Sequence, residues 1–268
     1  MRRKNYEIHI GDNRFNAIQF GSGTQHLVIL PGLSDGMATV RGKVYPGSVL
    51  YRKYAEQYTV TIISRKDNLS LRETTKSLAR DQALAMQALG ITKAHIMGIS
   101  MGGMIAQHLA ADYPSMVDKL ILVSTCPACD NLLRDNAGRW IGFAHMGAFL
   151  GLIIDISEKS HTEKKLKAVR RLYPYLGSAA RKTDIDRFCA SVQACMAHDA
   201  TDSLDRITAP TLVLAGEKDR TIDPEGAHLL HRSLSGSQLK IYEGQSHAVY
   251  LDEPDFYKDV LAFLEESL

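Results

Sequence analysis

The sequence has few cysteines, little net charge and no long apolar run, and each scarcity excludes a class of protein. The 4 cysteines in 268 residues are too few for a disulfide framework, so we expect free thiols in a reducing compartment. The formal net charge of +2 provides no global field that would attract nucleic acid. The basic start at residues 1–4 is read as a solvated terminus, because no apolar signal-like run follows it. The sequence predicts a cytoplasmic protein with no nucleic-acid or membrane partner.

Two local patterns point elsewhere but lack the residues that would complete them. Residues 140–156 are apolar but contain glycine, histidine and aspartate, so we expect a buried or pocket-lining helix pair rather than a membrane span. Cys126 and Cys129 form a CxxC pattern with no second CxxC and no nearby histidine pair. We therefore expect neither a metal site nor a redox centre there.

Short runs rich in valine and isoleucine alternate with longer segments of helical apolar spacing. This alternation predicts βαβ units and a mostly parallel, doubly wound sheet, so the fold class is α/β. An opening hairpin is expected from residues 7–10 and 16–20. Further strands are expected at 26–30, 60–64, 94–99, 119–124, 211–215 and 238–242, with helices at 49–57, 74–89, 101–112, 224–233 and 255–265.

Residues 128–203 interrupt this alternation with helical patterns and no strong strand. We expect an all-helical cap there, inserted into a core formed by residues 1–127 and 204–268. The cap is rich in large apolar side chains, which are interpreted either as the cap's own core or as an apolar lid over a binding site. These side chains are Trp140, Phe143, Met146, Phe149, Leu150 and Leu152.

Ser100 is the candidate nucleophile, because it lies in a G-x-S-x-G pattern between a strand and a helix with no gap. Such an abrupt turn strains the central residue and leaves no room for side chains at Gly98 and Gly102. It also lifts the hydroxyl to the start of a helix, where developing negative charge is stabilised. The alternative is a glycine-rich turn with a helix-capping serine.

A serine nucleophile needs a neutral histidine to accept its proton and a carboxylate to orient that histidine. His247 follows the last predicted strand, and Asp219 follows the strand before it. Both loops leave the carboxyl edge of the sheet, as Ser100 does. Other carboxylates near these loops are read as loop or capping residues, and they are Glu217, Asp223 and Asp252.

Backbone N–H groups at the same edge are candidate donors to an oxyanion. Met101 follows the candidate nucleophile. Leu33 follows the turn at Pro31 and Gly32, after the first predicted parallel strand. The turn at Leu33 can also be read as a simple end to that strand.

These residues resemble the α/β-hydrolase superfamily, specifically its small capped esterases, lactonases and carbon-carbon bond hydrolases. The best matches are residues 98–103, 209–219 and 244–247, and Ser100, Asp219 and His247 follow in the superfamily's order. Many relatives have histidine before the glycine of the oxyanion loop, where this chain has Pro31, and the segment 65–70 also departs from the common acidic, glycine-rich pattern.

The resemblance implies acyl transfer through Ser100, without a metal or an organic cofactor. A carboxylic ester or lactone of a small, partly apolar molecule is the first substrate choice. Carbon-carbon bond hydrolysis, haloperoxidase-like activity and a low-turnover ligand receptor remain as alternatives on the same residues. Nothing in the sequence fixes the substrate or the oligomeric state.

Overall fold

The structure is a computed structural model that describes residues 2–177 and 184–266. Its eight strands form a single sheet in the order β1-β2-β4-β3-β5-β6-β7-β8. Strands β1 (Arg2–Ile10) and β2 (Asn13–Gly21) form an antiparallel hairpin. Strand β2 continues antiparallel to β4 (Thr59–Ile63) and so joins the hairpin to the rest of the sheet.

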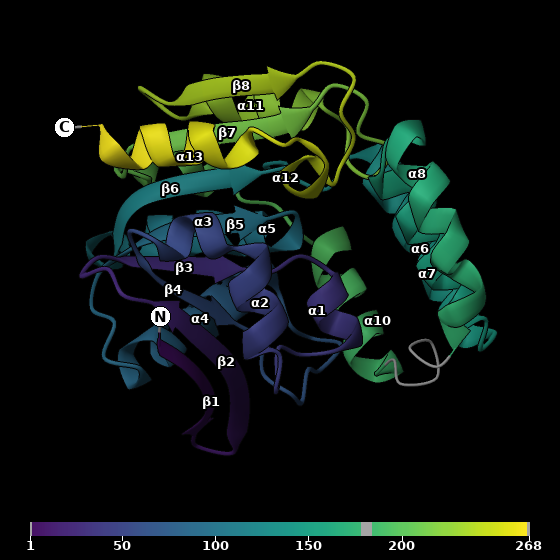
Figure 1. Cartoon of the computed structure of the whole chain (residues 1–268), viewed down its shortest axis with the longest axis horizontal. Helices are drawn as coiled ribbons and strands as arrows, with labels where there is room; N and C mark the ends of the chain where they lie inside the picture. The colour runs from purple at the N-terminus through teal and green to yellow at the C-terminus, as the bar shows by residue number, and fades with distance from the viewer. Residues whose placement is uncertain (1, 178–183, 267–268) are drawn as a thin grey trace.

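The remaining strand pairs are parallel, as the sequence predicts. These strands are β3 (His26–Leu30), β5 (Ala94–Ile99), β6 (Val117–Val123), β7 (Thr211–Gly216) and β8 (Gln238–Tyr242). Their carboxyl ends all point toward the same end of the molecule (Figure 1). Residues that follow these strands are therefore brought to one edge.

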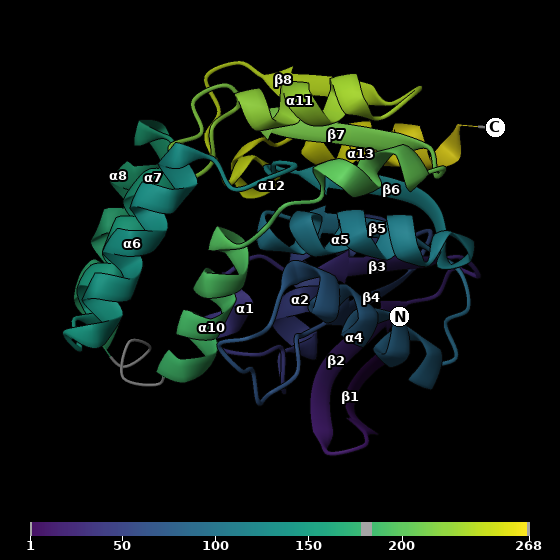
Figure 2. The same cartoon turned by 180° about the vertical axis from the view of Figure 1, so that it is seen from behind.

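Helices cover both faces of the sheet, which confirms the α/β fold class. One face carries α4 (Thr75–Ala88), α5 (Met101–Asp112) and α11 (Glu225–Ser233) (Figure 2). The other carries α2 (Val44–Leu50), α3 (Arg52–Ala55) and α13 (Phe256–Glu265), seen from the front in Figure 1. The pleat divides the core between these layers.

Strand β6 illustrates that division, because its side chains alternate between two buried clusters. Leu120 and Leu122 pack in the cluster that contains α5, whereas Ile121 and Val123 pack in the cluster that contains α13. A strand that is buried on both faces is apolar along its whole length. The continuous apolar runs of the sequence therefore predicted the central strands well.

The helical segment between β6 and β7, which we call the cap, lies beyond the carboxyl edge of the sheet (Figure 1). Its helices are α6 (Asn131–His145), α7 (Phe149–Ser160), α8 (Glu163–Val169), the 3-10 helix η2 (Arg170–Tyr175) and α10 (Ile185–Met196). Residues 178–183 of the expected cap lie outside the described residues. An isolated antiparallel bridge pairs Ala128 with Asp199, where the chain enters and leaves the cap.

Four shorter helical segments complete the described chain. They are α1 (Ser34–Met37), η1 (Pro114–Met116), η3 (Thr201–Arg206) and α12 (Val249–Asp252). Within residues 2–177 and 184–266, no helix combines the length and apolarity needed to cross a membrane.

Two predictions for the first sixty residues were wrong in detail. The hairpin strands are longer than expected, and β1 includes the basic residues from Arg2 onward as an exposed edge strand. The helix expected at 49–57 is replaced by two shorter helices, α2 and α3. Helix α2 begins before the expected position, and Pro46 is tolerated there because it lies in the first turn. Gly47 allows this helix to approach the sheet, because a Cβ there would come within 2.6 Å of the Ile18 side chain.

Candidate active site

Ser100 lies at the sharp turn between β5 and α5, with φ of 55° and ψ of −119°. A positive φ is strained for a residue with a side chain. The turn is held by the Ser100 N–H, which donates to the Val123 carbonyl oxygen at 2.8 Å, and by the Ser100 carbonyl, which accepts from Gly103 at 2.8 Å. The strain therefore persists at the sheet edge, where Ser100 is half-buried.

The glycines around Ser100 are required by close backbone approaches. A Cβ on Gly98 would come within 2.5 Å of the Gly102 carbonyl oxygen. A Cβ on Gly102 would collide with the carbonyl oxygens of Leu30 and Pro31. The turn at Ser100 thus fits tightly against the loop after β3, as the G-x-S-x-G pattern predicts.

His247 connects Ser100 to Asp219 by two hydrogen bonds. Its Nε2 lies 3.0 Å from the Ser100 Oγ, and its Nδ1 lies 2.7 Å from Oδ2 of Asp219. A carboxylate can only accept, so Nδ1 carries the proton and neutral Nε2 can accept the serine proton. The structure brings together the three side chains that the sequence placed at separate strand ends.

Asp219 is itself held by backbone donors. Its Oδ1 accepts from the N–H groups of Thr221 at 2.7 Å and Ile222 at 3.1 Å, which leaves Oδ2 for His247. The competing carboxylates have other partners. Glu217 accepts from the Gly244 N–H, and Asp223 accepts from the Glu225 N–H.

A second serine with positive φ forms a hydrogen bond with the backbone of His247. Ser124 follows β6, has φ of 48° and donates its hydroxyl to the His247 carbonyl oxygen at 2.8 Å. The loops that carry Asp219 and His247 also pair directly, since the Lys218 N–H donates to the Gln245 carbonyl at 2.7 Å. These contacts fix the imidazole relative to both neighbours.

The two candidate oxyanion donors come from the start of α5 and from the loop after β3. Met101 is the first residue of α5, and Leu33 is the residue that precedes α1. N–H groups at helix starts have no partner within the helix. A Cβ on Gly32 would lie 3.3 Å from the Ser100 Cβ, so the Leu33 loop lies directly against the serine.

The Leu33 loop is anchored by a buried ionic network that the sequence did not predict. Arg65, just after β4, donates to the carbonyl oxygens of Pro31 at 3.0 Å and Gly32 at 3.1 Å. Asp35 accepts from the Ser64 hydroxyl at 2.5 Å and from Arg187 Nη2 at 2.8 Å.

Arg187 lies on α10, so this network joins the cap to the Leu33 loop. The side chains of Arg65, Asp35 and Arg187 are each no more than 3% exposed. Burial lowers the pKa of the Arg65 guanidinium, and Asp35 partly offsets that effect. Asp35 is the one carboxylate that both guanidinium groups share, so its removal would leave two buried positive charges uncompensated.

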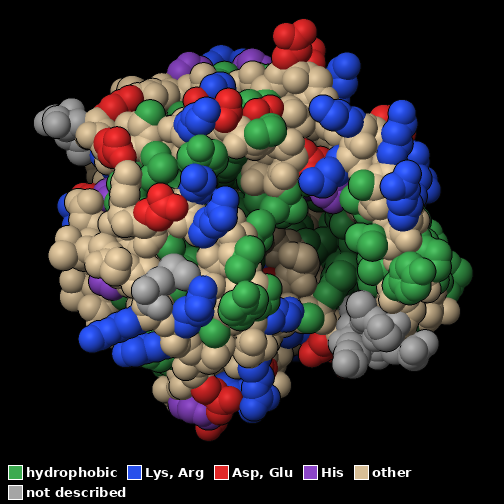
Figure 3. Space-filling view, viewed as in Figure 1, with side chains coloured by type: hydrophobic (Ala, Val, Ile, Leu, Met, Phe, Trp, Pro, Cys, Tyr) green, Lys and Arg blue, Asp and Glu red, His purple; other side chains and the backbone are tan. Residues whose placement is uncertain are grey.

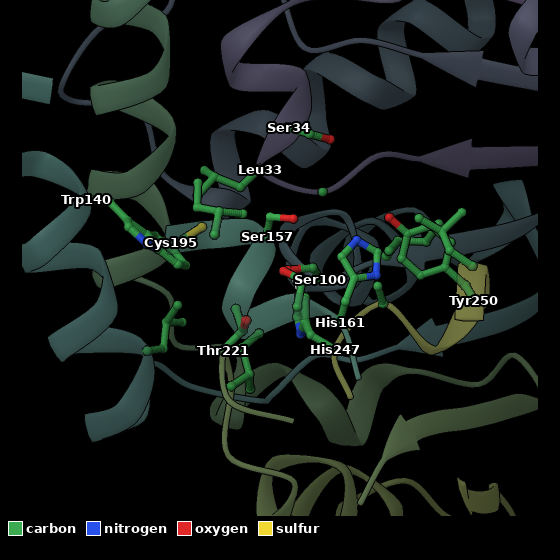
Figure 4. Close-up of a pocket in the computed structure, with 18 of the residues that line it drawn as sticks. Leu33, Ser34, Ser100, Trp140, Ser157, His161, Cys195, Thr221, His247 and Tyr250 are labelled. Atoms are coloured by element: carbon green, nitrogen blue, oxygen red, sulfur yellow. Dashed lines mark hydrogen bonds between the residues drawn. The ribbon is translucent and has the colours of Figure 1, made fainter. Parts of the chain in front are cut away.

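Ser100 and His247 open into a cavity of about 300 Å³ between the sheet edge and the cap, and Figure 3 shows the molecule hollowed in this region. Its walls are mostly apolar. The apolar lining includes Leu33, Met37, Met104, Leu133, Trp140, Ile153 and Ile156. The polar lining includes Ser157, His161, Thr221 and Tyr250, which Figure 4 labels.

The six large apolar side chains of the cap do not all follow one of the two interpretations. Trp140 lines the cavity, whereas Leu152 is fully buried and Met146 is 72% exposed. Ile153 and Ile156 of α7 also line the cavity. The sequence identified the apolar helix pair but not which of its faces points to the cavity.

The cysteines have the properties of buried thiols. Burial raises the pKa of Cys195, which lines the cavity, to about 12. Burial also raises the pKa of Cys126 and Cys129, and both are free. Because the thiolate is the reactive form, these side chains are poor nucleophiles.

Three groups near the site were missed by sequence reasoning. Arg65 follows a parallel strand, so the strand-end rule that found Ser100 could have found it. Arg187 and His161 lie on cap segments, and their relation to the sheet edge depends on tertiary packing. No local pattern marks either of them.

The chain belongs to the family with the alpha/beta hydrolase fold, whose model matches residues 6–254. Over 179 residues it is 28% identical to a pimeloyl-(acyl-carrier protein) methyl ester esterase of Neisseria meningitidis. That match covers 62% of this chain and 67% of the relative. A second Neisseria meningitidis esterase of the same name is matched over only 55% of its length.

Two solved structures extend the likeness over nearly the whole chain. An α/β-hydrolase enzyme from a deep-sea metagenome library of the Medee basin superposes with a TM-score of 0.85, covers 98% of both chains and is 19% identical. The enol-lactonase of Burkholderia xenovorans superposes with a TM-score of 0.82, covers 97% of this chain and all of its own, and is 18% identical. At these identities the likeness shows the fold.

Proposed function

We propose that this protein is a serine hydrolase that cleaves a carboxylic ester or a lactone of a small, partly apolar molecule. The observation that carries the proposal is the continuous hydrogen-bonded chain from Asp219 through His247 to Ser100, which opens into the cavity. The Neisseria meningitidis relative is also an esterase. The cavity volume lies at the lower end of small-molecule sites, so short acyl chains are favoured.

In the proposed reaction, Ser100 Oγ attacks the carbonyl carbon while His247 Nε2 takes the serine proton. The N–H groups of Leu33 and Met101 stabilise the negative oxygen of the tetrahedral intermediate. The carbon-oxygen bond to the alcohol then breaks, and His247 returns its proton to the leaving oxygen. Water, deprotonated by His247, cleaves the acyl-enzyme and regenerates Ser100.

Each of these residues has a defined role in lowering the barrier. Asp219 keeps the His247 proton on Nδ1 and stabilises the imidazolium that forms. The positive φ of Ser100, its position at the start of α5 and its contact with His247 support this assignment, because a reacting group held in place avoids an entropic cost. No step requires a group beyond this chain, the substrate and water.

The test is hydrolysis of p-nitrophenyl esters from acetate to a long acyl chain, with purified wild-type protein beside Ser100→Ala. We expect kcat to fall by about 10⁴-fold or more in the variant. Exposed Ser115 provides the matched control, and Ser115→Ala should behave as wild type. Wild-type turnover in Ser100→Ala would overturn the proposal, and inactivity of the wild type on every ester would redirect the search to carbon-carbon bond substrates.

A further inference from the structure

A second histidine-carboxylate pair faces the same cavity. His161 follows the last residue of α7, and its Nδ1 lies 3.0 Å from both carboxylate oxygens of Asp252 on α12. The Asp252 side chain is 3% exposed, and His161 lines the cavity together with Ser100 and His247. Figure 4 shows His161, Ser100 and His247 in the same close-up. The proposed reaction uses only one of the two imidazoles.

The end of α7 is fixed to the loop that carries His247. The Ala248 N–H donates to the Ser160 carbonyl at 2.8 Å, and the Ser246 hydroxyl donates to the Lys159 carbonyl at 3.0 Å. These are carbonyl groups that a helix leaves without internal partners at its C-terminus. The position of His161 is therefore set relative to the reacting end of the cavity.

One face of α7 lines the cavity with apolar side chains toward its middle and polar side chains at its end. Ile153, Ile156, Ser157 and Ser160 line the cavity at helical spacing, and His161 follows them. The polar members are those nearest the His247 loop. Among the described residues that line the cavity, no lysine, arginine, aspartate or glutamate is present. A substrate's polar substituent would meet hydroxyl groups and His161 there.

The pairing with Asp252 decides what His161 can bind. A carboxylate only accepts hydrogen bonds, so Nδ1 carries the proton, and Nε2 of the neutral ring is an acceptor. The Thr162 N–H and the Lys165 ammonium also lie near Asp252, at 3.5 and 3.9 Å. A neutral hydroxyl group can donate to Nε2, whereas an ether or ketone oxygen cannot.

We propose that His161, oriented by Asp252, is a binding subsite for a hydroxyl group of the substrate. The substrate class is then a hydroxylated ester or lactone whose apolar part lies against Trp140 and the isoleucines of α7. This inference rests on the proposed function for the bond that is cleaved, but the hydroxyl recognition can be measured without catalysis.

Trp140 gives a direct signal, because it is the single tryptophan of the chain and lines the cavity. Its fluorescence is titrated with 4-phenylbutan-1-ol and, separately, with the methyl ether of that alcohol, at about pH 8.5 where histidine is ordinarily neutral. We expect the alcohol to bind the wild-type protein about 3- to 10-fold more tightly than the ether, the value of one hydrogen bond.

Two variants separate the acceptor from its support. His161→Asn keeps an amide donor for Asp252 but removes the acceptor Nε2. The variant should lose affinity for the alcohol, so that the alcohol and the ether bind equally tightly. In Asp252→Asn, the Thr162 N–H donates to the new amide oxygen, so the amide nitrogen faces His161 and donates to Nδ1. The histidine proton then moves to Nε2. The ether should then bind more tightly than it binds the wild type. Exposed His145 on α6 is the control, and His145→Asn should keep the wild-type preference.

The subsite would be overturned by any of three results. These are equal affinities of the wild type for the two ligands, no saturable binding of either ligand, and a preference for the alcohol that survives in His161→Asn. Hydroxyl preference without ester turnover would support the subsite and contradict the proposed function. Ester turnover that depends on Ser100, with no hydroxyl preference, would contradict the subsite alone.

Discussion

The two sides of the cavity are built by different kinds of interaction. On the sheet side, the conformation of Ser100 is set by glycines and backbone hydrogen bonds at the ends of neighbouring strands. On the cap side, Arg187 reaches a carboxylate 152 residues earlier in the chain. The sheet side is thus held mainly by backbone contacts at the ends of strands, whereas the cap side depends on contacts between polar side chains. The difference predicts that substitutions on the two sides fail in different ways.

After Ser100→Ala, the largest effect is expected on the sheet side, from Asp219→Asn. The amide no longer fixes the His247 proton on Nδ1, so kcat for a p-nitrophenyl ester should fall by about 10⁴-fold while the fold is kept. Exposed Asp223, four residues on, provides the control. If Asp223→Asn lost as much activity as Asp219→Asn, the assignment of the acid would be wrong.

Stability should be most sensitive on the cap side, at Arg187. Arg187→Met leaves Asp35 paired with Arg65 alone and leaves the buried carbonyl oxygens of Arg65 and Lys66 without their donor. The free energy of unfolding should therefore fall by about 3–5 kcal/mol. Arg206 also pairs with a carboxylate, Asp112, but its side chain is 46% exposed. Urea denaturation of Arg206→Met should show a loss below about 1 kcal/mol. Equal losses in the two variants would contradict a structural role for the buried network.

Two helical glycines sharpen the same contrast. Gly102→Ala places a Cβ against the Leu30 carbonyl and should destabilise the protein by about 1–3 kcal/mol. Gly138 lies in the middle of α6 with open space around it, so Gly138→Ala should stabilise by up to about 1 kcal/mol. Thermal unfolding of both variants measures the difference, and a stabilising Gly102→Ala would show that the turn at Ser100 is looser than described.

The junction between cap and core should respond to acid through His198. Burial lowers the pKa of His198 to about 3, and its ring is held by Thr75 and the Cys126 carbonyl. The unfolded chain binds the extra proton between about pH 6.5 and 3, so this residue's contribution to stability is complete above that range and is lost as pH falls. The slope is up to about 1.4 kcal/mol per pH unit.

His198→Gln removes that titration and should flatten the decline of unfolding free energy between about pH 6 and 4. His26, His95 and His108 also have pKa values lowered by burial and leave a residual slope. Exposed His145→Gln is the control. An unchanged slope in His198→Gln would contradict the assignment.

Much of the core could be predicted because local rules determine it. Strand β5, the turn at Ser100 and helix α5 have the predicted bounds, since a continuous apolar run, two glycines and a helical pattern each act within a few residues. The meeting of Ser100, Asp219 and His247 also followed from the sequence. Parallel strands in one sheet bring their carboxyl ends together.

The rest could not be predicted because it depends on contacts between distant segments. Apolar spacing identified the helices of the cap but did not show that Ile153 faces the cavity while Met146 faces solvent. The pairing of His161 with Asp252 joins the end of α7 to the end of α12, 91 residues apart. Nothing near either residue in the sequence indicates its partner.

The pairing of Ala128 with Asp199 has a consequence for how this architecture can change. The Cys129 N–H donates to the His198 carbonyl at 2.9 Å, and the Ala200 N–H donates to the Pro127 carbonyl at 2.8 Å, so the chain leaves and rejoins the sheet at adjacent points. An insertion with neighbouring ends can be lengthened, shortened or exchanged without moving the strands that flank it. We therefore expect a cap grafted at this bridge to give the same strand ends a differently shaped chamber, provided that it supplies a partner for Asp35 in place of Arg187.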